Sequence, residues 1–542
     1  PADLFWEVPR EESHGDYASN IALTLFSSNP SFPSRPSSPR QLAELLVGNL
    51  KKNSQLQKLV SQIEVAGPGF INFTLTPETL LDELKEIEKK KHEFGKGKSL
   101  KNKKIMVEFT DPNPFKEFHI GHLFSNTVGE ALSRLFVSQG AMVKRVNYQG
   151  DVGMHVAKSV WGMMKLADEI PAESVPLPEK AKFMGKAYAF GATKFEEDEK
   201  VKKEITELNK KIYDKDPNVM ELYGKGRKWS LDYFETIYKR LGTKFDYYYF
   251  ESVAGKVGLE FVKENLKEGI FQESQGAIIF PGEKYGLHTR VFVNSLGLPT
   301  YEAKDLGLAP TKYKDFEYDE SVIVTGNEID EYFKVLITAL KQINPELGKK
   351  AHHISHGMVR LPEGKMSSRT GKVLTGEWLL DEVKKTILEL MAKSDSKFSD
   401  PEREETAEKV SVGSIKYALL KAGTGHDVVF DLEKSVSLEG NSGPYLQYTY
   451  ARCQSVLAKA TNPNAQRLNQ QPITNNQLNP EELSILRWIY RFPEVVQEAA
   501  VQYSPNLVCT FLYELAQRFN TFYNKHRILE GKDQKTKNKE QT

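Results

Sequence analysis

The sequence has only two cysteines, Cys453 and Cys509, among 542 residues. So few cysteines exclude a disulfide framework and indicate a reducing compartment, and we therefore expect a cytoplasmic protein. No apolar run approaches the roughly 20 residues of a membrane-spanning helix. The first residues, PADLFWEVPR, lack the apolar stretch of a signal peptide. We expect no membrane partner.

An excess of charge of one sign is also lacking, because 74 Lys+Arg oppose 73 Asp+Glu and the net charge is +1. This balance excludes a uniformly basic coat for nucleic acid, so any polyanion must bind at local basic patches. The composition, 39% hydrophobic and 27% charged, is typical of globular proteins. At roughly 100–200 residues per domain, the length predicts about three to five domains.

Metal-ligand clusters and a phosphate-binding P-loop are missing from the sequence. His352, His353 and His356 lie close together, but the cysteines are remote and no carboxylate pattern fits zinc. We therefore expect no protein-bound metal, and we interpret His352 and His353 as surface or strand-end residues.

Residues 1–94 predict a small α+β domain. Strand-like alternation flanks a Gly-Pro-Gly turn at 67–69. A helix is expected to follow, with Thr76 as its N-cap and Pro77 at its first position.

A strand–helix–strand pattern follows the lysine-rich linker at 95–104. It comprises a strand at 104–109, a helix at 119–140 and a strand at 141–149. Such a unit predicts parallel pairing and a Rossmann-type doubly wound α/β sheet. Its ligand site lies beyond the carboxyl ends of the strands.

The catalytic Rossmann domain is expected at 95–395, interrupted by a charged, mostly helical insertion at about 160–290. Sheet-like patterns return in AIIFP, RVFVN and SVIVTGN. Residues 396–542 show helical patterns only, so we expect an all-helical C-terminal domain.

The strongest local signal is the tetrapeptide HIGH, which begins at His119 and ends at His122. Two histidines at this spacing share one helix face. At a helix N-terminus they add donors to unpaired backbone N–H groups, which suits a polyphosphate. Gly121 between them lets a flat base approach the backbone. The alternative is a pair of ordinary surface histidines.

The second signal is the polar segment LPEGKMSSRTGK at 361–372. Alone it would be an exposed basic loop, but with HIGH it resembles the mobile KMSKS loop of class I aminoacyl-tRNA synthetases. The resemblance implies that this loop closes over ATP, which would involve Lys365, Met366, Ser367 and Ser368. It would stabilise charge on the triphosphate as pyrophosphate leaves.

Further segments resemble the arginyl-tRNA synthetase family in order and spacing over nearly the whole chain. They are HGDYASNIAL, VAGPGFINFTL, VEFTDPNPFKEFHIGHL, VNYQGDVGMH, LPTYEAKDLGLA and FDLEKSVSLEGNSGPYLQYTYAR. The resemblance implies ATP-dependent ligation of L-arginine to its cognate tRNA(Arg) through an arginyl-adenylate, with release of AMP and pyrophosphate. It also implies a monomer and Mg²⁺ that enters with ATP. Residues 1–94 would bind the tRNA elbow and 396–542 the anticodon.

The resemblance assigns His119 and His122 to the ATP phosphates and Gly121 to the adenine. The family's second loop lysine is Ser368 here, and Lys116, just before HIGH, would supply the missing cation beside Lys365. The alternative for Lys116 is a solvated loop lysine.

The resemblance assigns Asn113 to the amino or carboxylate end of the amino acid, and Tyr301 and Asp305 to its guanidinium. A planar cation with five donors suits a carboxylate beside an aromatic hydroxyl. The alternative for Tyr301 is an ordinary half-buried tyrosine. Asp151 is a further candidate for substrate binding, with a helix N-cap as its alternative. His155 stands where many family members have glutamine.

Rival functions are another HxGH-type nucleotidyltransferase without tRNA, a class I synthetase of different amino-acid specificity, and a non-catalytic RNA-binding paralogue. The long helical C-terminal region argues against the first. The intact His119, His122 and Lys365 argue against the last.

Replacing Lys116 tests whether this lysine compensates for Ser368. We expect Lys116→Ala to slow adenylate formation strongly, because an ammonium beside the leaving pyrophosphate is lost. In the Lys116→Ala variant, Ser368→Lys should restore part of the rate, because the new lysine would place a positive charge on the opposite side of the triphosphate. Single-turnover kinetics measure both effects. Normal kinetics in Lys116→Ala would contradict the compensating role and favour the alternative, a solvated loop lysine.

Overall fold

The computed structural model describes residues 6–9, 11–28, 36–362, 374–393, 398–460 and 478–528. The chain forms two compact units. Unit 1 combines Pro1–Lys96, Thr449–Val495 and Phe511–Thr542, and unit 2 combines Gly97–Tyr448 and Val496–Thr510.

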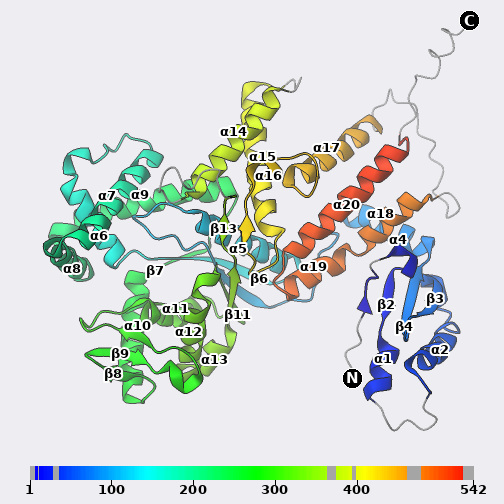
Figure 1. Ribbon diagram of the computed structural model, residues 1–542, viewed down its shortest axis with the longest axis horizontal. Helices are drawn as coiled ribbons and strands as arrows, with labels where there is room; N and C mark the ends of the chain where they lie inside the picture. The colour runs from blue at the N-terminus through cyan, green and yellow to red at the C-terminus, as the bar shows by residue number, and fades with distance from the viewer. Residues whose placement is uncertain are drawn as a thin grey trace, which may run out of the picture. The chain divides into compact units, whose positions relative to one another are not determined.

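The centre of unit 2 is a five-stranded parallel sheet (Figure 1) in the order β12-β11-β5-β6-β7. After β7 the chain returns to the far side of β5, so the strand order reverses between β5 and β11 and opens a crevice at the carboxyl ends. The predicted doubly wound sheet is confirmed. Its strands are β5 (Lys104–Glu108), β6 (Met142–Gln149), β7 (Tyr247–Phe250), β11 (Glu320–Gly326) and β12 (Ala351–His356).

Helices cover the sheet on both faces, as is usual for an all-parallel sheet. Met106 of β5 packs in a core with Leu306 and Phe333 from one helical layer. On the other face, Gly129 lies so close to Phe109 that a Cβ atom there would come within 2.2 Å of its side chain. The helices of these layers are α5 (Ile120–Ser138), α10 (Glu251–Lys267), α11 (Tyr301–Asp315), α12 (Asp330–Ile343) and α13 (Pro345–Lys350).

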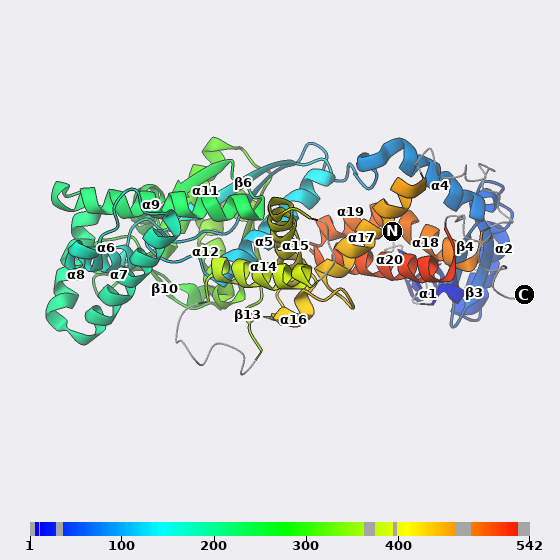
Figure 2. The same cartoon turned by 90° about the horizontal axis from the view of Figure 1, so that it is seen from above.

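Four helices between β6 and β7 form a second core in unit 2, grouped together in Figure 2. They are α6 (Met154–Lys165), α7 (Leu177–Glu197), α8 (Glu199–Tyr213) and α9 (Pro217–Leu241). The expected helical insertion therefore exists, but the range 160–290 also contains β7, an edge strand of the main sheet, and a small antiparallel sheet. The strands of that sheet are β8 (Gln272–Ser274), β9 (Ala277–Phe280) and β10 (Arg290–Val293).

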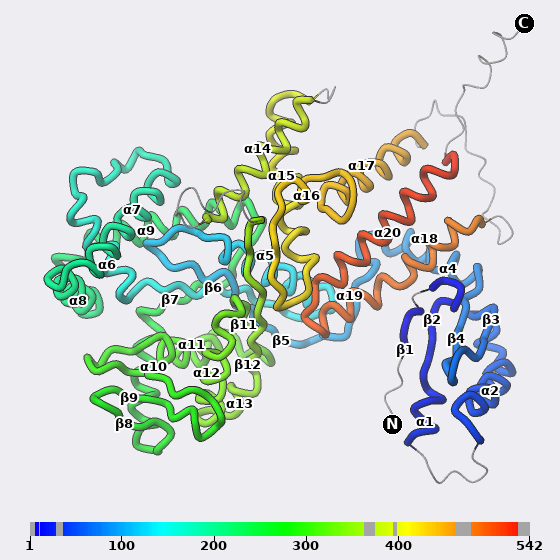
Figure 3. The backbone as a smooth tube through the Cα atoms, viewed as in Figure 1, coloured from blue at the N-terminus to red at the C-terminus, as the bar shows by residue number. Residues whose placement is uncertain are grey.

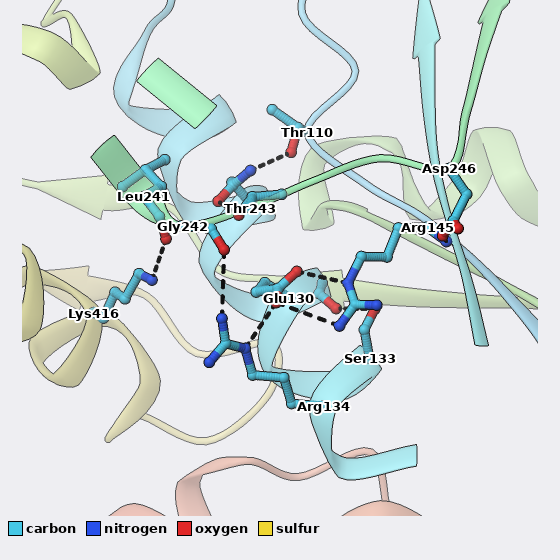
Figure 4. Close-up of polar contacts among 12 residues, drawn as sticks. Thr110, Glu130, Ser133, Arg134, Arg145, Leu241, Gly242, Thr243, Asp246 and Lys416 are labelled. Carbon is cyan, nitrogen blue, oxygen red and sulfur yellow. Dashed lines mark hydrogen bonds and ion pairs between the residues drawn. The ribbon is translucent and has the colours of Figure 1, made fainter. Parts of the chain in front are cut away.

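A network around Glu130 joins α5 to its neighbours, as Figure 4 shows. The buried Glu130 carboxylate pairs with Arg134 at 2.7 Å and with Arg145 of β6 at 2.8 Å. At the C-terminus of α9, Lys416 donates to the Leu241 carbonyl, where a cation offsets the helix dipole. Arg134 also donates to the Gly242 carbonyl at 3.4 Å, and Lys416 belongs to α15, so α5, β6, α9 and α15 are held together.

The remaining elements of unit 2 are short strands and helices that follow β12. They are β13 (Val359–Arg360), α14 (Gly376–Ala392), α15 (Asp400–Leu420), β14 (Val428–Val429) and α16 (Leu432–Ser435). Ion pairs of Arg240 with Asp381 and Glu408, both at 2.8 Å, tie α14 and α15 to α9. The α15 helix, which lies inside the expected helical domain 396–542, thus belongs to the compact unit that holds the sheet.

Unit 1 contains a four-stranded antiparallel sheet in the order β1-β2-β4-β3, which Figure 3 traces. The predicted strands on either side of the Gly-Pro-Gly turn are β3 and β4, and Thr76 caps the next helix with Pro77 at its start, as predicted. The elements are β1 (Trp6–Glu7), β2 (Tyr17–Ser19), α1 (Ile21–Ser28), α2 (Pro39–Leu50), α3 (Leu56–Leu59), β3 (Val60–Ala66), β4 (Phe70–Leu75) and α4 (Pro77–Lys90).

This sheet packs on helices from the other end of the chain. Asp16, in the HGDY segment, accepts a hydrogen bond from the Leu75 amide at 2.7 Å and pairs with Arg487 at 3.1 Å. Tyr17 donates to Glu494 at 3.1 Å. The C-terminal helices are α17 (Gly443–Ala460), α18 (Pro480–Tyr490), α19 (Phe492–Val501) and α20 (Asn506–Lys525).

The crossing of α10 and α11 leaves no room for a side chain at Gly258. A Cβ atom there would come within 1.6 Å of the Ala303 carbonyl oxygen, and backbone cannot swing aside. We expect Gly258→Ala to lower the free energy of unfolding by about 1–3 kcal/mol, the usual cost of overpacking.

Gly224→Ala is the matched control, because Gly224 lies inside α9 with open space around it. Alanine there should stabilise the protein by up to about 1 kcal/mol, since it loses less backbone entropy on folding. Urea unfolding measures both variants. Equal stability of the two would contradict the close crossing.

Candidate active site

The loop that joins β5 to α5 lies in the crevice and has a strained backbone. Thr110, Asp111 and Phe115 have φ values of 80°, 44° and 68°, which non-glycine residues rarely adopt. Hydrogen bonds compensate: Asp111 accepts from the Tyr148 amide at 2.7 Å, and Thr110 accepts from Asn126 at 2.9 Å. The loop is therefore held in one conformation.

Phe115 anchors this loop in the core formed by α6–α9. Its side chain is fully buried, and its N–H donates to the Ser230 hydroxyl at 2.8 Å. Its carbonyl accepts from Ser159 at 3.2 Å. Gly226 is required beneath it, because a Cβ atom there would lie 2.4 Å from the ring. The helical insertion thus positions the residues on either side of Phe115, among them Asn113 and Lys116.

HIGH begins α5, as the sequence predicts, and its two histidines cap the helix reciprocally. His119 Nδ1 accepts from the His122 amide at 3.4 Å, and His122 Nδ1 accepts from the His119 amide at 3.2 Å. Their rings stack with centroids 3.5 Å apart. Because each Nδ1 accepts, each neutral ring carries its proton on Nε2 and offers that N–H as a donor.

Burial keeps both imidazoles neutral. It lowers the pKa of His119 to about 4, with a further contribution from the Lys116 ammonium, and it lowers the pKa of His122 well below its usual value. Lys116 itself lies over the Tyr188 ring at 5.0 Å. The structure therefore brings a cation and two N–H donors to one helix N-terminus, an arrangement that favours phosphate.

Lys365, Met366, Ser367 and Ser368 lie outside the described residues. The segment that follows them does contact HIGH. The Leu374 carbonyl accepts from the Ile120 amide at 3.0 Å, and the Gly376 amide donates to the Phe118 carbonyl at 2.7 Å.

Tyr301 and Asp305 lie one turn apart on α11, as their spacing predicts for a helix. Tyr301 is 52% exposed. Asp305 keeps part of its surface open, although protein surrounds it densely, and it accepts a hydrogen bond from the Tyr332 hydroxyl. Burial raises the pKa of Asp305 to about 8, and the nearby carboxylates of Glu108 and Glu251 add to this rise.

Two buried ion pairs that the sequence analysis did not identify hold α11 in place. Lys304 pairs with Glu251 of α10 at 2.6 Å, and Lys312 pairs with Glu108 of β5. All four side chains are at most 6% exposed. The sequence signal that could have indicated one of these pairs is Lys304, which lies in the TYEAKD segment one residue before Asp305.

Asn113 links the two halves of the crevice. At Gly150, a Cβ atom would lie 2.2 Å from Asn113 Oδ1 and 3.1 Å from Glu251 Oε1. The Asn113 amide and the Glu251 carboxylate therefore converge over the Gly150 backbone. Lys304 pairs with the same carboxylate, so a chain of contacts leads from Asn113, in the loop before HIGH, through Glu251 to Lys304 on α11.

Asp151 is buried and already fully engaged by protein groups. It accepts from the Ser252 amide at 2.9 Å and the Ser252 hydroxyl at 2.8 Å, and it pairs with Arg227 at 3.1 Å. It does not cap the helix that follows it, because Gly153 is the N-cap of α6. Its carboxylate instead accepts a hydrogen bond from a backbone N–H in the first turn of α10, that of Ser252. It also borders a cavity of about 500 Å³ between α9 and α10.

His155 lies beside this site with one unpaired nitrogen. Its Nε2 lies 2.8 Å from the Gly150 carbonyl, so Nε2 carries the proton, while its buried Nδ1 has no partner among the described residues. Burial lowers its pKa to about 3, and the Lys116 ammonium adds to this. His155 is thus a neutral acceptor near Lys304.

Comparison with known proteins agrees with this arrangement. A family model described as the catalytic domain of class I (R) tRNA synthetases matches residues 83–432. The arginyl tRNA synthetase N-terminal domain matches 2–75, and the DALR anticodon binding domain matches 446–540. The arginine–tRNA ligase of Treponema denticola is 32% identical over 98% of this chain and 90% of its own length.

The chain belongs to the arginyl-tRNA synthetase family. A second family member, the arginine–tRNA ligase of Porphyromonas gingivalis, is 30% identical over 98% of this chain and 90% of its own length. The fold is that of the arginyl-tRNA synthetase of Thermus thermophilus, with a TM-score of 0.76 at 22% identity over 97% of this chain and 89% of that one. The Plasmodium falciparum structure gives 0.77 at 20% identity, over 98% and 89%.

The described residues offer neither a metal centre nor a membrane span. Within them, no group of three histidine, cysteine, aspartate or glutamate side chains is arranged to hold a metal ion. Among the same residues, no helix is both long and apolar enough to cross a membrane.

Acid should destabilise this arginyl-tRNA synthetase family member because His155 is buried in its neutral form. Its pKa lies near 3 in the folded state and near 6.5 when unfolded, so its contribution to stability is complete above pH 6.5 and is lost as the pH falls toward 3. Between pH 7 and pH 5 this histidine alone should cost about 2 kcal/mol of unfolding free energy.

His155→Gln should remove that share of the pH dependence, measured as urea unfolding at both pH values. His288→Gln, at an exposed histidine of the same unit, is the control and should leave the dependence unchanged. A wild-type slope in His155→Gln would show that His155 is protonated without cost.

Proposed function

We propose that this chain ligates L-arginine to its cognate tRNA through an arginyl-adenylate, with release of AMP and pyrophosphate. The observation that carries the proposal is the chain of contacts from Asn113, in the loop before HIGH, through Glu251 to Lys304, which precedes Asp305 on α11. Family membership supports the same activity. The contacts in the site and the family membership both disfavour the two rival functions, an HxGH-type enzyme without tRNA and a synthetase of another amino-acid specificity.

In the first step the arginine carboxylate attacks the α-phosphorus of ATP and pyrophosphate leaves. His119 and His122 present neutral Nε2–H donors to the phosphates, and Gly121 lies under the adenine. These donors are fixed before reaction, so no reorganisation is needed as charge moves to the leaving group. Lys116 and Lys365 supply positive charge around the triphosphate. Met366, Ser367 and Ser368, which follow Lys365, complete the ATP-binding segment.

In the pocket, Tyr301 and Asp305 receive the guanidinium, and Asn113 receives the amino or carboxylate end of arginine. The guanidinium has a fork of N–H donors that matches the Asp305 carboxylate. An amino acid with a neutral side chain would leave this carboxylate unpaired and is therefore disfavoured. Asp151 acts here by holding the start of α10, which carries Glu251, as well as by bordering the site.

Division of labour between the parts follows the family. Residues 1–94 bind the tRNA elbow, 95–395 catalyse, and 396–542 bind the anticodon. We expect Mg²⁺ to enter with ATP on its phosphate oxygens, because none of the described residues form a metal-holding group. We also propose that the protein is a cytoplasmic monomer.

Charging assays test this function directly. Purified protein, ATP and tRNA(Arg) should yield arginyl-tRNA with arginine and with none of the other amino acids. Exchange between pyrophosphate and ATP should stay near zero until tRNA is added. Charging with a different amino acid would overturn the proposal, and arginine-dependent exchange without tRNA would overturn the ordered step only.

Replacing His119 by asparagine separates catalysis from helix capping. Asparagine is a good N-cap, so α5 should keep its start, while the Nε2–H donor to phosphate is lost. We expect kcat for charging to fall by about 10²–10³ with little change in arginine binding. Thermal unfolding should shift little. Unchanged kcat would remove His119 from the catalytic groups.

A further inference from the structure

The acidic pocket, formed by the charged groups around Asp305 on α11, holds more carboxylates than cations. Each cation near Asp305 is already committed to another carboxylate. The pairs are Lys304 with Glu251 at 2.6 Å, Lys312 with Glu108, and Arg290 with Glu302 at 3.3 Å. Each pairing leaves no net charge to offset a further anion.

Asp305 and Asp111 are the two carboxyl groups of this region that form no ion pair among the described residues, and Asp111 already accepts a hydrogen bond from the Tyr148 amide at 2.7 Å. The hydrogen-bond partner of Asp305 is the neutral Tyr332 hydroxyl, and no lysine, arginine or histidine forms an ion pair with this aspartate in the part of the chain that the structure describes. Its surroundings are dense protein, but part of its surface stays exposed. An isolated carboxylate in such surroundings is costly, and the usual outcome is that it binds a proton.

The carboxylates that face Asp305 come from several elements, and each of them raises its pKa. In addition to burial, the negative charges of Glu108 on β5, Glu251 on α10 and Glu302 on α11 raise its pKa, to about 8, against the lowering effect of the Tyr332 hydroxyl on α12. Two further groups interact with it electrostatically, Asp111 in the loop after β5 and Tyr148 on β6.

We propose that Asp305 carries a proton in the arginine-free protein and releases it when arginine binds. The guanidinium supplies the missing positive charge, so the Asp305 carboxyl ionises, its proton passes to the buffer, and a carboxylate–guanidinium pair forms. Charge balances, because the pocket gains one cation and loses one proton. This inference rests on the proposed function, in which the guanidinium reaches Asp305.

Proton release makes the pocket select for charge as well as shape. A neutral side chain of the same size leaves Asp305 protonated and gains no ion pair. Below about pH 8 the affinity for arginine should rise with pH, by up to tenfold per pH unit, because the proton that must leave is held less tightly. Above that range the affinity should level off.

Calorimetric titration with arginine measures the released proton. The full-length protein with saturating tRNA, but without ATP, is titrated at pH 7 in buffers of different ionisation enthalpy. With a pKa near 8, about nine in ten Asp305 groups are protonated at pH 7, so the heats should indicate release of about one proton. At pH 9 the release should fall to about a tenth.

Variants separate this titration from a merely structural role. Asp305→Asn should abolish the release. Tyr332→Phe removes a hydrogen bond to the carboxylate and should move the release profile to higher pH, whereas Glu302→Gln removes a negative charge and should move it to lower pH. Asp315→Asn, at an exposed aspartate near the end of the same helix, is the matched control and should leave the release unchanged.

The outcomes distinguish this inference from the proposed function. Charging with arginine together with buffer-independent heats at pH 7 would overturn proton release and leave the function standing. Proton release from Asp305 would likewise be overturned if Asp305→Asn still binds arginine and releases the proton. Absence of both arginine charging and arginine binding would overturn the function, and the inference with it.

Discussion

The structure of the candidate active site depends on how charge is balanced around α11. Lys304 and Lys312 are buried, and an unpaired buried ammonium would be very costly. Each reaches a glutamate on a different element, Glu251 on α10 and Glu108 on β5. These two pairs, with the backbone contact at Gly258, fix the position of α11 against the sheet. Tyr301 and Asp305 are thereby placed by interactions that they do not make themselves.

A second constraint acts at the phosphate side of the crevice. The loop after β5 has a strained backbone, and the helical insertion compensates by burying Phe115 and binding its N–H and carbonyl groups. The Nδ1 atoms of both HIGH histidines cap α5, and their Nε2–H groups form no hydrogen bond with the residues that the structure describes. These contacts and caps hold the candidate phosphate-binding groups at the start of α5 in place.

Local signals in the sequence predicted the elements that carry chemistry. HIGH at a helix N-terminus, the Thr76 cap and the helical spacing of Tyr301 and Asp305 depend on residues within one or two turns of each other. Edge strand β7 was missed because it lies within a charged, helical stretch. The close association of the N-terminal sheet with α18 and α19 was missed as well, since Asp16 and Arg487 are brought together only by folding.

The sequence by itself determined the fold class, the family resemblance and the identity of most candidate site residues, because motifs and hydrophobic periodicity are written in consecutive residues. Tertiary structure alone decided their protonation and their surroundings. Asp151 became a buried partner of Ser252 and Arg227, and His155 a neutral acceptor. Asp305 forms no ion pair among the described residues, because the neighbouring cations pair with other carboxylates. Burial and charge pairing depend on residues far apart in the chain, and no spacing along the sequence encodes them.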